Sequence, residues 1–266
     1  LKHRRCPAPE FGYYPGIQSS FVSRPHEPAK EPFPVFVPLR DDNPLRVIRW
    51  QWVTVGLIVA NVTIFGLQLA ISDERYIASF AAIPSELLGS GGGAARGPYD
   101  ALAIPEALTL VTYQFLHGSP LHLIGNMLFL WVFGDNIEDA MGHLRFLAFY
   151  LLCGIAGGLA HAVMTPASSI PLIGASGAVA GVIAAYLILH PRVRVWVLAF
   201  RFIPLRITAA WALGAWIATQ FMMLLVPDGS PVAWWAHIGG ILAGAFLIVF
   251  MRRRGVPLFD QGQRFV

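Results

Sequence analysis

Six apolar stretches follow one another along the chain after residue 46, with more polar segments between them. They lie near residues 52–71, 120–140, 146–164, 175–190, 207–226 and 232–251. A helix needs about 20 residues to cross a bilayer, with ~17–25 usual, and four of the stretches meet this length easily. The second ends in acidic residues and the fourth is short, but short loops join both to convincing neighbours. We therefore predict an all-α polytopic membrane protein with six transmembrane helices.

The remaining segments are more polar and mark the limits of this membrane domain, which we place at residues 47–252. Residues 1–46 hold nine of the 20 prolines and no apolar period, so we expect a disordered tail without a secretory signal. Residues 253–266 form a second tail. The stretch 72–119 is too polar to span a bilayer and contains three consecutive glycines, which predicts a long loop with short interfacial helices.

Composition supports a membrane protein and gives its orientation. Hydrophobic residues make up 56% of the chain and charged residues 13%, whereas soluble domains carry about a quarter charged residues. If the N-terminus is cytoplasmic, 17 of the 19 lysines and arginines fall on the cytoplasmic side, and only Arg75 and Arg96 fall outside. This asymmetry places both termini in the cytoplasm. It also explains the net charge of +4 without a nucleic-acid partner.

Polar residues gather at the starts of the second, fourth and sixth stretches, which all run inward from the non-cytoplasmic side. His122 and Asn126 open the second, Ser176 opens the fourth, and His237 opens the sixth. Such groups are costly within a membrane and usually face a protein interior or a water-filled cavity. Three helices that carry them at one depth predict a single shared site.

Small residues predict that the fourth and sixth helices approach closely, because Gly177 and Gly181 on one and Gly240 and Gly244 on the other are spaced four apart. That packing would bring Ser176 and His237 together. A serine hydroxyl becomes a nucleophile when a neighbouring base takes its proton, and neutral histidine suits this task. The sequence places no carboxylate near these outer helix ends, which favours a dyad. His122 and Asn126 share a helix face and, with the Ser176 N–H, are candidate oxyanion donors.

At this point the motifs resemble those of the rhomboid family of intramembrane serine proteases, in its bacterial six-span form, over roughly residues 47–252. The matching motifs are His117-x4-His122-x3-Asn126, Gly134-x3-Glu138-x3-Gly142, Gly174-Ala175-Ser176-Gly177 and Ala236-His237-x2-Gly240-x3-Gly244. Each motif alone is weak, but their order, spacing and placement on the helices agree together.

The resemblance implies a water-accessible dyad below the non-cytoplasmic surface of a bacterial inner membrane, and cleavage of single-span membrane proteins. It implies no metal, nucleotide or other cofactor. Ser176 would be the nucleophile and His237 the general base and then acid. His122 and Asn126 would serve the oxyanion hole. His117 and Glu138 would be structural, with Glu138 holding the backbone at the cytoplasmic end.

Two departures from the family pattern affect support around the site. Many relatives carry a Trp-Arg pair in the first loop where this chain has Leu108 and Thr109, so the loop must be anchored differently. Some relatives stack a tyrosine on the catalytic histidine where this chain has Ala180. His237 must therefore be oriented by other contacts, from the second or fifth helix.

Other readings of the same residues remain open. An intramembrane serine is usually a hydroxyl bonded to its own helix, and His161 is best read as a packing residue. Trp216 and Gln220 are candidates for a substrate gate in the fifth helix. A transporter would use the intramembrane histidines as a proton or ligand path, but no inverted repeat is apparent. A non-catalytic relative that binds membrane clients is the other alternative.

Overall fold

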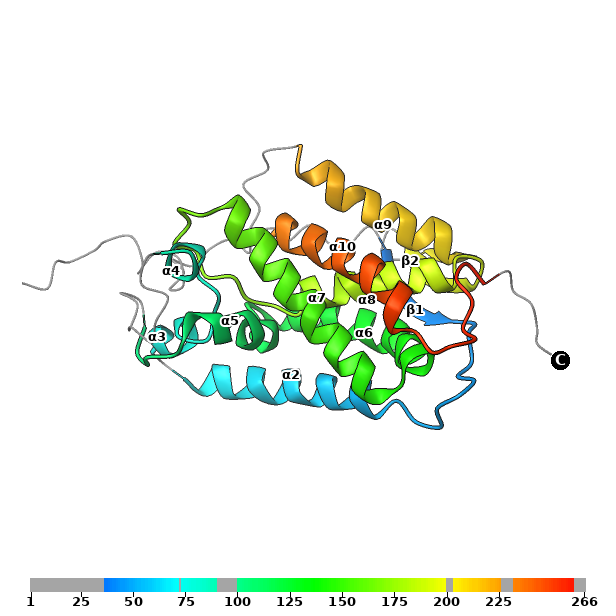
Figure 1. The fold of residues 1–266 in the computed structure, drawn as a ribbon, viewed down its shortest axis with the longest axis horizontal. Helices are drawn as coiled ribbons and strands as arrows, with labels where there is room; N and C mark the ends of the chain where they lie inside the picture. Colours follow the sequence, from blue (N-terminus) through cyan, green and yellow to red (C-terminus); the bar gives the residue numbers. More distant parts are fainter. Residues whose placement is uncertain (1–35, 72, 90–99, 200–202, 226–231, 261–266) are drawn as a thin grey trace, which may run out of the picture. The chain divides into compact units, whose positions relative to one another are not determined.

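Six long helices make up about half of the residues that the structure describes, and each coincides with a predicted apolar stretch to within three residues at either end. The computed structural model describes residues 36–71, 73–89, 100–199, 203–225 and 232–260, whose helices and strands belong to one compact unit (Figure 1). The long helices are α2 (Trp52–Ala70), α6 (Pro120–Met141), α7 (His143–Met164), α8 (Ser176–Leu189), α9 (Ala209–Met223) and α10 (Trp234–Met251).

Three of the described helices, α2, α7 and α10, are long and apolar enough to cross a membrane. Helix α8 is apolar but has only 14 residues. It lies at the centre of the bundle, where every residue from Gly177 to Tyr186 is buried. A helix that is apolar on all sides is suited to such a position, because neighbouring helices cover its whole circumference.

The long loop after α2 contains short helices, as predicted. They are α3 (Glu74–Ala78), α4 (Pro84–Leu87), α5 (Glu106–Thr112) and the 3₁₀ turn η1 (Tyr113–Phe115). Two buried side chains at the end of this loop contact α7. The Tyr113 hydroxyl donates to the Gly154 carbonyl oxygen at 2.6 Å. The Gln114 amide occupies the place that a side chain on Gly154 would take. These two contacts anchor the end of the loop to α7, in a chain that lacks the Trp-Arg pair of many relatives.

A three-stranded antiparallel sheet corrects the all-α prediction. Strand β2 (Arg194–Ala199) lies between β1 (Phe36–Asp41) and β3 (Ile203–Thr208). The β2 side chains alternate between more exposed and buried positions, which is the period of a strand covered on one face. No strand was predicted between the fourth and fifth apolar stretches. We also placed residues 36–46 in a disordered tail, which is wrong for β1; residues 1–35 lie outside the described part.

Two carboxylates near the end of α6 hold the chain that leads into α2. Glu138 is fully buried and accepts from the Val53 and Thr54 backbone N–H groups at 3.0 and 2.8 Å. These N–H groups belong to the first turn of α2, where no carbonyl within the helix can accept from them. Asp139 accepts from three consecutive N–H groups, those of residues 46–48. These contacts agree with the structural role that we predicted for Glu138.

The segment after α10 packs back onto the same end of the bundle, although we predicted it as a tail from residue 253. The Phe259 and Asp260 N–H groups both donate to carbonyl oxygens at the end of α8, at 2.8 Å each. The Asp260 carboxylate also pairs with Arg46 at 3.4 Å. The entry into α2 and the exit from α10 are therefore joined to α6 and α8 at this end.

Candidate active site

The backbones of α8 and α10 touch over one full turn at their first glycines. A Cβ atom added to Gly240 would overlap the Gly177 carbonyl oxygen, and one added to Gly244 would overlap the Gly181 carbonyl oxygen. Both small-residue pairs that the sequence singled out therefore meet each other. Because the earlier glycine of one pair faces the earlier glycine of the other, the two helices begin at the same end of the bundle.

This contact brings the start of α8, which carries Ser176, close to the start of α10, which carries His237. Gly177, which follows Ser176, has the Ala236 carbonyl oxygen 3.3 Å from the point where its Cβ would lie. Ala236 in turn precedes His237 in the chain. Ser176 is partly exposed, and 8% of His237 is exposed. A partly exposed serine therefore lies at the start of α8, and a largely buried histidine lies at the start of the neighbouring helix α10.

His122 belongs to the same end of the bundle, since its ring packs against the segment before Ser176. Gly174 has φ +123°, a conformation that residues with a side chain rarely adopt. A Cβ on Gly174 would lie 2.7 Å from the His122 Cε1 atom. The first turn of α6 is held by Ser119, whose Oγ accepts from the His122 N–H at 3.1 Å.

Asn126 lies one turn after His122 on the same face of α6, and only 7% of it is exposed. Within the part of the chain that the structure describes, its Nδ2 donor is buried without a hydrogen-bond partner. A buried donor left in this state costs about 1–3 kcal/mol, so an acceptor that reached it would be bound favourably. The Asn126 amide is available to an oxygen atom that reaches the site.

His117 is positioned through its backbone, which contacts α2. Gln68 on α2 accepts from the His117 N–H at 3.0 Å and donates to the His117 carbonyl oxygen at 3.3 Å. The His117 ring stands edge-on to His122, with ring centroids 5.1 Å apart. Burial, with His122 as the next cause, lowers the pKa of His117 to about 4, so this ring is neutral at pH 7. These contacts fit a structural part at the entry to α6.

His237 is oriented from the fifth long helix, which is one of the two sources we predicted in place of the missing tyrosine. The Gln220 Oε1 atom on α9 lies 2.8 Å from His237 Nδ1. The rings of Trp216 and Trp234 lie 6.2 and 5.8 Å from the His237 ring. The sequence reading named Trp216 and Gln220 only as gate candidates. The sequence signal for the contact with His237 is the Gln220 amide, which stands in an otherwise mainly apolar helix.

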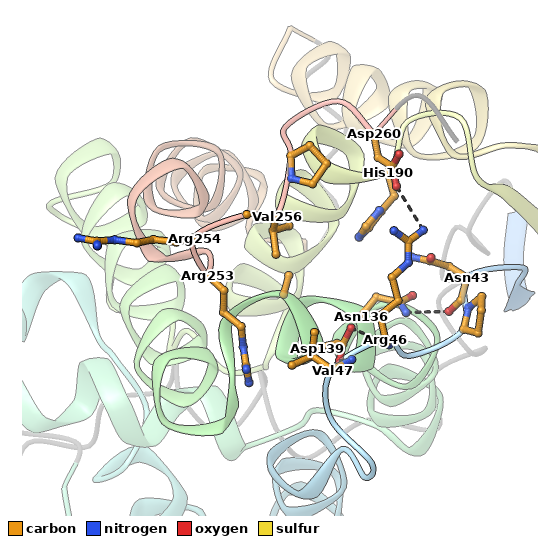
Figure 2. A pocket seen from close by; sticks show the side chains of 14 residues that line it. Asn43, Arg46, Val47, Asn136, Asp139, His190, Arg253, Arg254, Val256 and Asp260 are labelled. Carbon is orange, nitrogen blue, oxygen red and sulfur yellow. Dashed lines mark hydrogen bonds and ion pairs between the residues drawn. The ribbon is translucent and has the colours of Figure 1, made fainter. Parts of the chain in front are cut away.

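A cavity with a volume of about 470 Å³ lies at the other end of the bundle (Figure 2). None of the predicted site residues lines it. Its walls come from the lead-in to α2, the end of α6, His190 and residues 253–260. Burial lowers the pKa of His190 to about 4, so the imidazole in this wall is neutral at pH 7. Asp139 and Asp260 both line this cavity. Their hydrogen bonds join the segments before α2 and after α10 to α6 and α8, so the cavity belongs to a structural junction.

Three carboxylates in the described part of the first loop lie close enough together to hold a metal ion. Ligand atoms of Glu86, Asp100 and Glu106 are all within 4.8 Å of one another. Burial and then the neighbouring Asp100 raise the pKa of Glu106 above its usual value. None of the three is a predicted site residue. The predicted dyad of Ser176 and His237 does not include these carboxylates.

Comparison with protein families matches residues 105–254 to the Rhomboid domain. The chain belongs to the rhomboid family. The matched range contains every rhomboid motif residue named above, from His117 to Gly244.

Curated relatives agree with this assignment. The chain is 31% identical over 209 residues to the presenilin-associated rhomboid-like proteins, mitochondrial, of Bos taurus and Homo sapiens, which covers 75% of this chain and 48% of each relative. It is 31% identical over 144 residues to RHOMBOID-like protein 5 of Arabidopsis thaliana, covering 53% of this chain and 43% of that protein. This rhomboid thus spans about half the length of the curated relatives it matches.

Family membership and the apolar helices together identify an integral membrane protein. The relatives named here come from mammals and a plant, and the first two carry a mitochondrial name. They give no support to the bacterial inner membrane that the sequence resemblance suggested.

Proposed function

We propose that this rhomboid is an intramembrane serine endopeptidase in which Ser176 is the nucleophile and His237 the general base. The observation that carries the proposal is the backbone contact of Gly177 with Gly240 and Ala236. This contact lets the first turns of α8 and α10 present a hydroxyl and an imidazole to one another.

In the proposed reaction, the Ser176 hydroxyl oxygen attacks the carbonyl carbon of a peptide bond while His237 takes the hydroxyl proton. The carbonyl oxygen becomes an oxyanion, for which the Asn126 Nδ2, His122 and the Ser176 N–H are the candidate donors. His237 then gives its proton to the leaving amine as the C–N bond breaks. Water hydrolyses the acyl-enzyme with His237 again acting as base. The buried, unpartnered Asn126 donor supports this assignment of the oxyanion site.

The proposal includes six membrane crossings with both termini in the cytoplasm. Three described helices are long and apolar enough to cross, and the distribution of lysine and arginine supports the orientation. The dyad then lies near the non-cytoplasmic surface. Its substrates are single-span membrane proteins, cleaved in or near the spanning helix. A peptide bond must leave its helix to be attacked, and exposed backbone at that depth is tolerated only inside a protein-lined, wet cavity.

Purified protein in proteoliposomes, incubated with a panel of single-span reporters, tests this function. Ser176→Ala and His237→Ala should each abolish cleavage, while Ser169→Ala, which changes an exposed loop serine, should leave it unchanged. Thermal unfolding confirms that each variant is folded. Normal cleavage by Ser176→Ala would exclude the mechanism. Wild-type protein that binds the reporters without cutting them would instead favour a non-catalytic rhomboid that binds membrane clients.

A further inference from the structure

The identity of the atom beside His237 Nδ1 determines what this histidine can do. A histidine that accepts a proton from serine must present an unprotonated ring nitrogen to it, with the hydrogen on the other nitrogen. In many serine hydrolases a carboxylate holds that hydrogen. Here the partner of Nδ1 is the Gln220 amide oxygen at 2.8 Å, and Gln220 is 4% exposed.

The orientation of the Gln220 amide follows from its other contacts. Its Nε2 donates to the Trp216 carbonyl oxygen at 3.0 Å and to the Thr219 Oγ1 at 3.1 Å. The Thr219 hydroxyl uses its own hydrogen on the Trp216 carbonyl, at 2.6 Å, and therefore accepts from Gln220. Turning the amide over would set its oxygen against the Trp216 carbonyl oxygen, and two acceptors would face each other. The amide oxygen must therefore point at His237.

An amide oxygen only accepts, so His237 Nδ1 must carry the hydrogen and Nε2 must carry the lone pair. We propose that Gln220 is a positioning residue that holds His237 in the tautomer and orientation required of the base. This inference rests on the proposed function, which it deepens. A neutral amide fixes the tautomer without adding a charge. It also takes over the orienting part that a tyrosine plays in some relatives, at the position of Ala180.

Because Gln220 belongs to α9 and His237 to α10, the base is held only while the two helices are packed together. Trp216 and Ile217 of α9 pack against a cluster that contains Ile238 and Ile241 of α10. Figure 1 shows α9 along one side of the bundle, next to α10. Its outward side chains include Trp211, which is 76% exposed. If α9 moved away from α10, one side of the bundle would open, and His237 would lose its hydrogen bond to Gln220 in the same movement.

Two isosteric substitutions separate this role from simple packing. Gln220→Leu keeps the side-chain volume but removes the acceptor, and should lower kcat about tenfold or more, equivalent to about 1.4 kcal/mol, with little change in KM. Gln220→Glu keeps an acceptor oxygen in either protonation state. It should retain kcat within about threefold of wild type, measured at its own optimal pH, because an oxygen that accepts the His237 Nδ1 hydrogen is still present.

The matched control is Asn61→Leu, which also replaces a buried amide. Asn61 lies on α2, where its Nδ2 donates to the Leu57 carbonyl oxygen at 2.8 Å. The Asn61→Leu variant should keep the wild-type kcat. Full pH profiles are needed for every variant, because His122 on α6 and His161 on α7 also interact electrostatically with His237. Their titration should appear equally in the wild-type, Gln220→Leu and Asn61→Leu profiles, so the comparison of these three isolates the effect of Gln220.

Nitrogen-15 NMR of histidine-labelled protein reads the tautomer without any substrate, and loss of one signal set in His237→Gln provides the assignment. Wild type and Gln220→Glu should show a protonated Nδ1, and Gln220→Leu should lose that preference. If the wild type is active, and Gln220→Leu has the same tautomer and the same kcat, the inference is overturned. The proposed function is unaffected by that result. Cleavage that does not depend on Ser176 overturns both.

Discussion

The contact between α8 and α10 makes a specific prediction for Gly240→Ala. The added methyl group would overlap the Gly177 carbonyl oxygen, which is backbone and cannot rotate away, so the two helices must move apart. Overpacking of this kind costs about 1–3 kcal/mol, whereas replacing glycine by alanine within a helix gains about 1 kcal/mol. The net loss of unfolding free energy is therefore small, about 0–2 kcal/mol.

Activity should respond far more strongly than stability. A displacement of about 1 Å between reacting groups costs on the order of 10²-fold in rate, and this substitution acts one turn from His237. Cleavage of a single-span reporter should fall about 100-fold in Gly240→Ala, and also in Gly244→Ala, whose methyl group would overlap the Gly181 carbonyl oxygen. Thermal unfolding should show both variants folded.

The controls are Gly56→Ala in α2 and Gly214→Ala in α9, because a Cβ atom at either position has nothing within 4 Å. Both should keep wild-type cleavage and equal or higher stability. If Gly240→Ala behaves like these controls in both assays, the two helix backbones do not touch as described, and the argument that brings Ser176 to His237 fails with them.

Three other predictions concern the oxyanion site and the opposite end of the bundle. Asn126→Ala should lower kcat by ~10²–10³-fold with a smaller change in KM, because one oxyanion donor is lost, and an unchanged kcat would remove Asn126 from the mechanism. Glu138→Ala should lower the unfolding free energy by ~2–5 kcal/mol in chemical denaturation, since two N–H groups that open α2 lose their acceptor, and a loss below ~1 kcal/mol would contradict this. Burial raises the pKa of Asp41 to about 6, although its hydrogen bond from Tyr186 opposes the shift, so the folded state binds this proton more tightly than the unfolded state. Stability should therefore fall as pH rises from about 4 through 6, by about 3 kcal/mol, and Asp41→Asn should lack this fall. Subtracting the two curves removes the titration of other groups, and a flat difference would refute the assignment.

The helices could be predicted from sequence because each is a mainly apolar run, although α6 ends in acidic residues. The starts of α6, α8 and α10 were also predictable, since His122, Ser176 and His237 are polar residues in otherwise apolar surroundings. The small-residue pairs on α8 and α10 indicated which faces meet, because few other faces of these helices allow such close approach.

Contacts between distant segments were not predictable in the same way. Strand β1 pairs with β2 across about 150 residues, and neither has more than six residues, so local patterning does not reveal the pair. The partners of Glu138 are also remote, 84 and 85 residues away, because the N–H groups that it binds belong to the start of α2.

Gln220 shows a different limit of sequence reading. Its position in α9 was noted, but which way it faces depends on the rotation of α9 about its own axis. That rotation is set by the packing of Trp216 and Ile217 against α10, which one apolar helix does not specify on its own. The amide was therefore read as part of a gate, whereas the structure brings it to His237.

The most direct test of the central claim asks whether the Ser176 hydroxyl is activated by His237. Purified protein would be treated with a fluorophosphonate probe, and the modified residue identified by mass spectrometry of the digested protein. The proposed dyad predicts covalent labelling at Ser176 in the wild type, and loss of that labelling in both Ser176→Ala and His237→Ala. Labelling at another serine, or labelling of Ser176 that persists at full rate without His237, would contradict the account.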